Sequence, residues 1–282
     1  MEFALQLQNV SKNYKDFSLD NINISLPYGC IMGFIGENGS GKTTTIKLIL
    51  DLIKRDSGTI TILGQDNIKD IKKVKENIGV VIDESCFPEM LTLAEVNCIL
   101  KNIYKTWDNN KFEILTKQFS LQKDKKIKDY SKGMKMKLSI AIALAHDTKI
   151  LILDEATSGL DPLIRDEILD VFRDFIQNDR HSIFMTSHII SDLEKICDYI
   201  TMIHHGKIIL NQSTDELMES YGILKCSEAD FKTINPAIVK GFRKNSFGIE
   251  ALVLKNGIRG NFVIDNASIE DIMVYSVKEA KL

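Results

Sequence analysis

The sequence predicts an α/β fold with a mainly parallel core sheet. Apolar segments typical of buried strands alternate with segments whose apolar residues recur at helical spacing, and this alternation is typical of parallel sheets covered by helices. A glycine-rich segment, GENGSGKT, separates the first core strand from a helix that we expect to continue to Arg55. The expected core strands are 30–36, 78–82, 149–154 and 182–187.

The flanking segments predict three additions to this core. Residues 3–10 and 19–26 have the pattern of strands, which predicts an N-terminal antiparallel β subdomain. The lysine-rich, helical stretch within residues 84–140 indicates an α-helical insertion between two strands of the core. The pattern changes near Asp215, so we expect a cassette over 1–215 and a small α+β domain over 216–282, with strands at 221–228 and 249–255 and a final helix.

The composition excludes several classes of protein. The chain has 282 residues, 44% of them hydrophobic and 27% charged, as ordinary globular proteins have. Its net charge of −3 gives no general attraction to nucleic acid. The five cysteines are scattered without metal-ligand spacing, which suits a reducing cytosol. No signal peptide and no apolar run of about 20 residues is visible, so we expect a soluble chain whose membrane role depends on a partner.

The glycine-rich segment matches the phosphate-binding pattern G-x-x-x-x-G-K-[ST]. Glycines let backbone N–H groups curl around an anion, and the following helix adds its positive dipole end. Lys42 is expected to reach the β- and γ-phosphates, Thr43 to place its hydroxyl on Mg²⁺, and Thr44 to donate to a phosphate oxygen. The predicted loop for a nucleoside triphosphate is Gly36, Glu37, Asn38, Gly39, Ser40, Gly41, Lys42, Thr43 and Thr44.

Two acids follow the continuous apolar strand ILILD. Ligands bind at the carboxyl ends of such buried parallel strands. Asp154 is expected to hold Mg²⁺, and Glu155 to act as general base on the attacking water. Alone, the pair favours an acidic, solvated turn; together with the phosphate loop it predicts a nucleotide site.

At this point the chain resembles the ATP-binding cassette (ABC) ATPases over about residues 1–215. Besides the loop and the acid pair, YSKGM occupies the signature position usually written LSGGQ, LILDEATSGLD ends at Asp161, and TSH ends at His188. The resemblance implies that Tyr14 stacks on adenine, although by position it is equally a packed surface aromatic. It also implies that His188 contacts the γ-phosphate, and that Ser131 and Gly133 contact the nucleotide of an opposite subunit.

The chain departs from this family pattern at three places. Asp83 stands where the family usually has glutamine, as in some relatives linked to peptide-antibiotic export and immunity, and we expect it to ligate Mg²⁺; the alternative ligand is Glu84. In the signature, Lys132 and Met134 replace the usual residues. Ala156 replaces a proline, which should leave the chemistry unchanged.

The resemblance implies an ATP-binding and ATP-hydrolysing subunit of a membrane transporter, most simply an exporter. Its cofactors would be ATP and Mg²⁺, and its partners a second ATPase subunit and transmembrane permease subunits at the inner face of the cell membrane. The permease would dock near residues 84–95, where Phe87, Met90 and Leu93 form either a groove or part of the core. The alternative function is a soluble ABC-type ATPase with a regulatory role.

Three polar features outside these motifs are expected to have no functional role. The lysines within 123–137 should form a solvated surface, and His146 should lie at the surface end of its helix. His204 and His205 should form a solvated turn rather than a metal pair.

Overall fold

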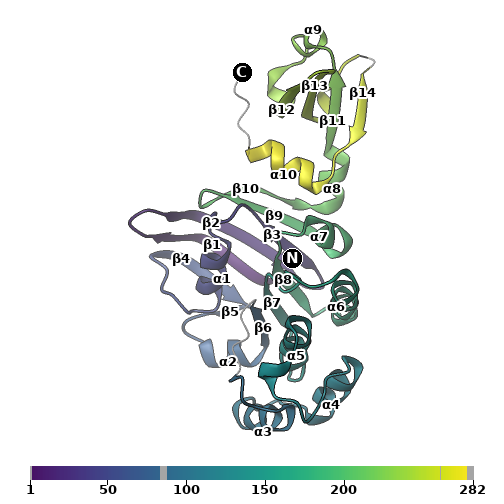
Figure 1. The fold of residues 1–282 in the computed structure, drawn as a ribbon. Helices are drawn as coiled ribbons and strands as arrows, with labels where there is room; N and C mark the ends of the chain where they lie inside the picture. The colour runs from purple at the N-terminus through teal and green to yellow at the C-terminus, as the bar shows by residue number, and fades with distance from the viewer. Residues whose placement is uncertain (1, 83–87, 261, 278–282) are drawn as a thin grey trace.

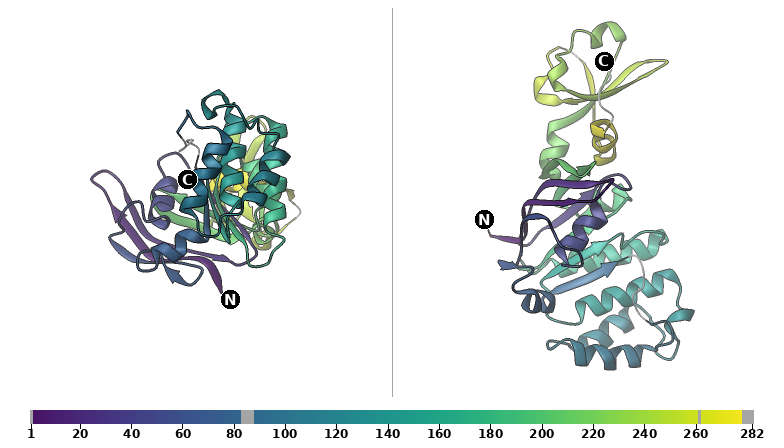
Figure 2. Two further views of the ribbon diagram at one scale, coloured as in Figure 1. Left: turned by 90° about the horizontal axis from the view of Figure 1, so that it is seen from below. Right: turned by 90° about the vertical axis from the view of Figure 1, so that its left-hand side faces the viewer.

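The computed structural model describes residues 2–82, 88–260 and 262–277. Two sheets and their helices form the centre of the molecule, while a helical subdomain and a separate C-terminal sheet lie at opposite ends (Figure 1). The right-hand view of Figure 2 shows the same elongated arrangement from the side, whereas the left-hand view is taken from below. Within the described ranges, every helix is too short or too polar to span a lipid bilayer.

The core sheet has the strand order β10-β9-β3-β8-β7-β6. All neighbouring strands run parallel except β10, which pairs antiparallel with β9. Every residue of β3 and of β8 is buried, as expected for strands covered on both faces. The strands are β3 (Ile31–Ile35), β6 (Ile78–Ile82), β7 (Ile150–Asp154), β8 (Ser182–Thr186), β9 (Tyr199–His204) and β10 (Lys207–Ser213).

The N-terminal sheet is antiparallel, with the order β2-β1-β4-β5. Its inward side chains form one hydrophobic cluster with the outer face of the core sheet and with α1 (Lys42–Ile49). That helix is shorter than the sequence pattern predicts, because Asp51 adopts a left-handed backbone conformation (φ 53°) that ends it. The remaining elements are β1 (Phe3–Asn13), β2 (Ser18–Pro27), β4 (Ser57–Ile62), β5 (Gln65–Asp66) and α2 (Ile71–Glu76).

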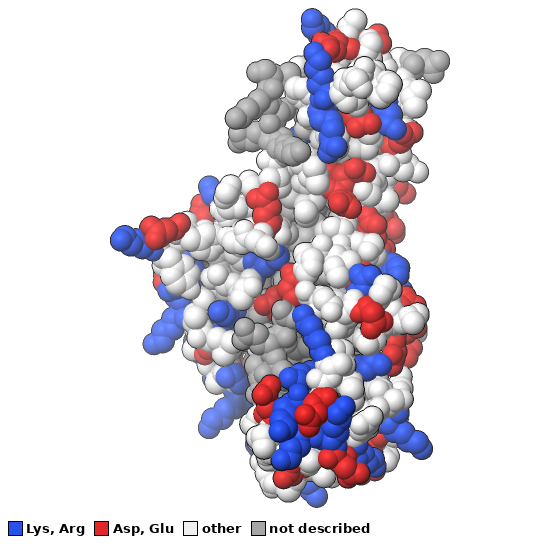
Figure 3. Space-filling view, viewed as in Figure 1, with Lys and Arg blue, Asp and Glu red and all other residues white. Residues whose placement is uncertain are grey.

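The helical subdomain is inserted between β6 and β7. Its first helix begins with a capping box, in which Thr92 and Glu95 satisfy each other's backbone N–H groups. Its last helix is buried on every side over Ile140–Leu144, because there it passes under the core sheet. Figure 3 shows Lys and Arg gathered with some acids over this end of the molecule. The helices are α3 (Leu93–Ile103), α4 (Asn109–Gln118), η1 (Ile127–Asp129) and α5 (Lys132–Leu144).

Three helices lie between β7 and the C-terminal sheet in the chain. The first, α6, starts at Pro162, whose missing N–H suits the first turn of a helix. The helices are α6 (Pro162–Phe175), α7 (Ile190–Ile196) and α8 (Thr214–Ser220).

The C-terminal sheet is antiparallel, with the order β12-β13-β11-β14. Its central strands correspond to the two segments that the sequence predicts, whereas the edge strands β12 and β14 are not predicted. Edge strands of this kind are short or charged, as VKGFRKN is, and show no clean alternation. The elements are β11 (Tyr221–Cys226), α9 (Glu228–Phe231), η2 (Pro236–Ile238), β12 (Val239–Asn245), β13 (Gly248–Leu254), η3 (Lys255–Gly257), β14 (Val263–Asn266) and α10 (Ile269–Val277).

The C-terminal sheet is joined to the cassette through α10. Ile269 and Ile272 of α10 belong to the same buried cluster as Leu193 and Ile196 of α7. The backbone N–H of Ile269 donates to the Glu194 carboxylate at 2.8 Å. The hydrophobic core therefore continues from the cassette into one face of the sheet. The exact division of domains between residues 215 and 216 stays a prediction.

This continuous core predicts that the C-terminal sheet and the cassette unfold together. Ile272 is 2% exposed, so Ile272→Ala should lower the free energy of unfolding by about 2–5 kcal/mol. Denaturant titrations followed by circular dichroism should show one shifted transition. Val263→Ala, at a side chain that is 66% exposed, is the matched control and should change stability by less than about 0.5 kcal/mol. A separate early transition in Ile272→Ala would contradict the shared core.

Candidate functional site

The phosphate loop connects the end of β3 to the start of α1. Gly39 and Gly41 have φ values of 80° and 118°, which favour glycine. A Cβ on Gly36 would lie 2.3 Å from the Ile203 carbonyl oxygen, and one on Gly41 would lie 2.5 Å from Leu19 Cδ2. The glycines therefore allow the loop to pack tightly against β9 and β2. This packing holds the N-terminal end of α1 in place as an anion site.

Lys42 lies inside this loop and is 7% exposed. Its Nζ donates to the carbonyl oxygens of Gly36 at 2.7 Å and Glu37 at 3.1 Å. Burial lowers the pKa of Lys42, while the negative charges of Glu155, Asp154 and Glu37 act in the opposite direction. The ammonium group is thus held at the centre of the loop, close to the two acids that follow β7.

The hydroxyl side chains of the loop differ in their surroundings. Thr43 is exposed and Thr44 is half-buried, so both can meet a ligand from solvent. Ser40 Oγ is buried and has no hydrogen-bond partner in the part of the chain that the structure describes. Thr45 is turned inward and bonds the Gly41 carbonyl at 2.9 Å. A buried hydroxyl without a partner in a loop of N–H donors fits an anionic ligand.

The acid pair lies at the carboxyl end of β7, beside β8. Asp154 and Thr186 are opposite each other in the parallel register, and Thr186 Oγ1 donates to Asp154 Oδ1 at 2.6 Å. The backbone N–H of Glu155 in turn donates to Thr186 Oγ1 at 3.1 Å. Glu155 has a φ of 55°, a strained conformation for a residue with a side chain. Thr186 therefore fixes the position of both acids.

His188 lies against Glu155. Its Nδ1 is 2.5 Å from Glu155 Oε2, and its backbone N–H donates to the same oxygen at 3.3 Å. The His188 side chain is 57% exposed, while that of Glu155 is 22% exposed. The histidine predicted from the sequence as a γ-phosphate contact thus also orients the predicted general base.

Tyr14 lies in the turn after β1 and is 48% exposed. Lys12 Nζ is 5.6 Å from the centre of its ring. In the same turn, Phe17 lies closer to the phosphate loop: its Cζ would be 3.0 Å from a Cβ on Gly41. The sequence analysis missed Phe17, although an aromatic residue so soon after Tyr14 and before a strand was a usable signal.

The prediction for His146 is wrong, and the prediction of a solvated turn holds for His205, which is exposed in a turn, but not for His204. His146 is not at the surface: it is 3% exposed, and its ring stacks on Tyr104 with centroids 4.2 Å apart. Burial is the main cause that lowers the pKa of His146. His204 is not simply solvated either, because its Nδ1 is 3.6 Å from Glu37 Oε2 of the phosphate loop. Neither position was visible from sequence, because both depend on contacts between segments far apart in the chain.

Ser131, Gly133 and Asp161 are not brought to the phosphate loop of their own chain. Ser131 Oγ accepts from the Met134 N–H at 3.2 Å and caps α5, and Ser131 is exposed. Asp161 Oδ1 accepts from the N–H groups of Leu163 and Ile164 and caps α6. Within the described residues, no hydrogen bond or ion pair joins these three residues to Gly36–Thr43.

Several remaining expectations concern the segment after β6. Asp83, Glu84 and Phe87 lie outside the described residues. Leu93 is 4% exposed and belongs to the core, whereas Met90 is 58% exposed. Only Met90 of the expected docking residues is therefore seen to be available to a partner.

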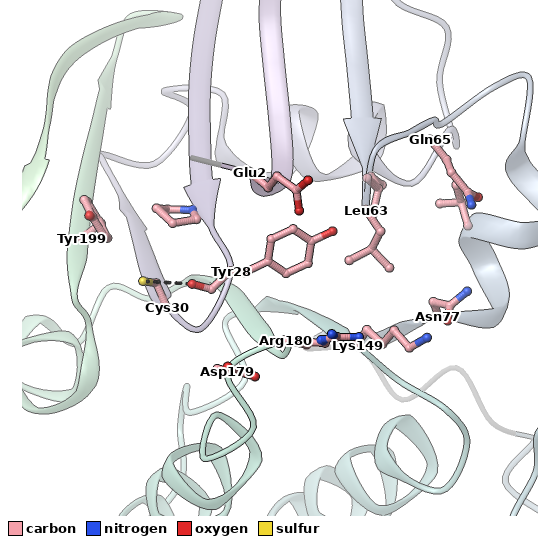
Figure 4. Close-up of a pocket in the computed structure, with 13 residues that line it drawn as sticks. Glu2, Tyr28, Cys30, Leu63, Gln65, Asn77, Lys149, Asp179, Arg180 and Tyr199 are labelled. Atoms are coloured by element: carbon pink, nitrogen blue, oxygen red, sulfur yellow. Dashed lines mark hydrogen bonds between the residues drawn. The ribbon is translucent and has the colours of Figure 1, made fainter.

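A separate hollow of about 960 Å³ lies at the opposite ends of the strands (Figure 4). Tyr28 points into it from the turn between β2 and β3, and Lys149 and Arg180 lie on the other side. None of the residues predicted for the nucleotide site lines this hollow.

The packing of Gly36 gives a prediction about ligand binding. Gly36→Ala should displace the loop from β9 and remove the rise in melting temperature that ATP causes by binding only the folded state. Gly64→Ala is the control, because Gly64 also has a positive φ (75°) but has nothing within 4 Å of an added Cβ. It should cost about 1–2 kcal/mol of stability yet keep the ATP-dependent rise. An unchanged rise in Gly36→Ala would contradict the assigned loop.

Comparisons with known proteins show the family of the chain. Residues 19–158 match the family profile described as ABC transporter. Bacitracin transport ATP-binding protein BcrA of Bacillus licheniformis is 36% identical over 220 residues, which cover 77% of this chain and 72% of that protein. Lantibiotic transport ATP-binding protein SrtF of Streptococcus pyogenes is 34% identical over 214 residues, covering 75% of this chain and 91% of that protein.

A solved structure shows the same fold. It is an ATP-binding cassette described as a dimer in a post-hydrolysis state, bound to ADP and Pi; it is 23% identical, has a TM-score of 0.66, and covers 74% of this chain and 98% of that one. The predicted fold class is confirmed. The chain belongs to the ABC transporter family, as the ATP-binding and ATP-hydrolysing subunit of a transporter.

Proposed function

We propose that this subunit closes head-to-tail on ATP with a second ATPase subunit, which is either another copy or a related chain. Each nucleotide site would combine Gly36–Thr43 of one subunit with Ser131 and Gly133 of the other. The observation that carries this proposal is the exposed cap of α5: Ser131 presents its hydroxyl and a helix N-terminus to solvent, apart from its own phosphate loop. Leu163, next to Asp161, is 84% exposed and provides an apolar contact for the same interface.

Mg²⁺ is the metal that the site fits. The hydroxyl of Thr43 and the carboxylate of Asp154 are hard oxygen ligands, which Mg²⁺ prefers. When bound, the ion would neutralise negative charge that develops on the phosphate oxygens. Asp83, which lies outside the described residues, stays a predicted further ligand.

The remaining site residues have separate roles in hydrolysis. Lys42 would bind the β- and γ-phosphates, and Tyr14 would form a wall for adenine, with Phe17 beside it. Glu155, oriented by His188, would accept a proton from the attacking water. The water oxygen bonds to the γ-phosphorus while the bond from that phosphorus to the bridging oxygen breaks, which yields ADP and phosphate.

The transporter would place this subunit at the cytoplasmic face of the membrane through permease subunits. The names of the relatives BcrA and SrtF support a peptide-antibiotic substrate, and we propose export as the direction. The exposed Met90, at the start of the helical subdomain, is the described residue best placed for a permease contact.

Glu155→Gln tests both the base and the dimer. The amide keeps the shape of the side chain but cannot take a proton, so hydrolysis should fall by about 10²-fold or more while ATP still binds. Size-exclusion chromatography with saturating MgATP should then show a dimer, and replacing Mg²⁺ by EDTA should abolish it. A monomer in MgATP would contradict closure, and hydrolysis at the wild-type rate would contradict the assignment of the base.

Ser131→Asp separates the role of Ser131 as a helix cap from its role across the interface. Aspartate caps helices as well as serine does, so the melting temperature should stay within a few degrees. Its negative charge would face the γ-phosphate held by the partner, so the MgATP-dependent dimer of Glu155→Gln should be lost in the double variant. Ser227→Asp, at the cap of α9, is the matched control and should leave the dimer intact. Retention of the dimer in the Ser131→Asp double variant would show that Ser131 only caps α5.

A further inference from the structure

A buried ion pair connects α6 to α7 beside the nucleotide site. Arg165 Nη1 is 3.5 Å from Asp192 Oδ1, and the Asp192 side chain is only 3% exposed. Asp192 lies in the first turn of α7, one helical turn after His188. Arg165 lies in the first turn of α6, and its backbone N–H donates to the Asp161 carbonyl at 3.0 Å. The pair therefore ties together the two segments that carry Asp161 and His188.

The pair makes only one of the two contacts that its groups allow. Arg165 Nε and Asp192 Oδ2 are both buried, and neither has a hydrogen-bond partner in the described part of the chain. A carboxylate and a guanidinium usually meet through two parallel hydrogen bonds. The two atoms without partners are the donor and the acceptor that a second bond requires. A small movement of α6 relative to α7 would supply it.

The first turn of α6 also touches the signature segment. A Cβ on Gly133 would lie 2.6 Å from Ile164 Cδ1, so Ile164 packs directly against this glycine. Ile164 precedes Arg165, so neighbouring residues of one helical turn contact the signature on one side and α7 on the other. A displacement at Gly133 is therefore passed to Asp192 through a single rigid turn.

We propose that Arg165 and Asp192 are positioning residues that couple the signature segment to His188. This inference rests on the proposed closure of two subunits. Contact of Ser131 and Gly133 with the partner's nucleotide pushes on Ile164, and the Arg165–Asp192 pair closes into its two-bond form. The closed pair fixes α7, which then holds His188 in its contact with Glu155 during hydrolysis. Neither residue is among those assigned to bind ATP or the attacking water, so the pair acts on the rate of hydrolysis and not on the affinity for ATP.

The molecule provides a matched control between the same two helices. Lys195 Nζ of α7 is 3.4 Å from Asp166 Oδ1 of α6, and these side chains are 51% and 60% exposed. Exposed pairs of this kind contribute little because water screens them. Lys195→Ala removes an ion pair between α6 and α7 without touching the buried one.

The experiment measures kcat and the Kd for ATP in the full-length protein. Asp192→Asn should lower kcat by about ten- to a hundredfold, as a misplaced catalytic group does, while Kd stays within about twofold. Asp192→Glu, which keeps both carboxylate oxygens, should recover most of the lost rate. Arg165→Lys keeps the charge but not the two-bond geometry, so it should also lower kcat. This variant tests the inference if Asp192→Asn does not fold. Lys195→Ala should leave both constants unchanged.

The outcomes separate this inference from the proposed function. A wild-type protein that hydrolyses MgATP, together with unchanged kcat in both Asp192→Asn and Arg165→Lys, would overturn the inference alone. An equal loss of kcat in Lys195→Ala would also overturn the inference, because the effect would then not be specific to the buried ion pair. Failure of Glu155→Gln to dimerise, with wild-type hydrolysis intact, would instead contradict the closure on which the inference rests.

Discussion

The parallel register of β3, β8 and β7 is the constraint on which the nucleotide site depends. Because these strands run in the same direction, their carboxyl ends meet at one edge of the sheet. The phosphate loop leaves β3 there, the acid pair leaves β7, and His188 follows β8. The hydrogen bond from Thr186 to Asp154 crosses this edge and fixes the acids. A slip of the register would move each of these groups away from the others.

The sequence was sufficient for the parts of this arrangement that are encoded locally. The bounds of β6 match the apolar run IGVVI, which the sequence predicts as a core strand. What the sequence did not show depends on distant contacts. The burial of His146 requires Tyr104 from another helix, and the position of His204 requires the phosphate loop. Phe17 likewise reaches Gly41 only in the folded chain, because β2 and β3 separate the two residues in the sequence.

Ser131 and Asp161 show why a residue's role inside one subunit says little about its role in an assembly. Each satisfies backbone N–H groups at the start of a helix, and either residue type would be chosen for that reason alone. Yet a helix start with a polar cap is also a surface that favours anions. At Ser131, under the proposed closure, the same local chemistry would serve the fold of one chain and a phosphate contact with another, so the two roles separate only when the cap is kept and the charge is changed.

The junction between α7 and α10 limits which chimeras can be made from this chain and its relatives. The Glu194 carboxylate receives the first N–H group of α10, and Leu193 and Ile196 pack in one cluster with Ile269 and Ile272. The C-terminal sheet is thus fitted to the outward face of a helix that begins just after His188. A chimera that joins this cassette to the C-terminal sheet of a relative would carry mismatched surfaces unless the face of α7 were exchanged with it. The natural unit of exchange therefore begins inside the cassette, at α7.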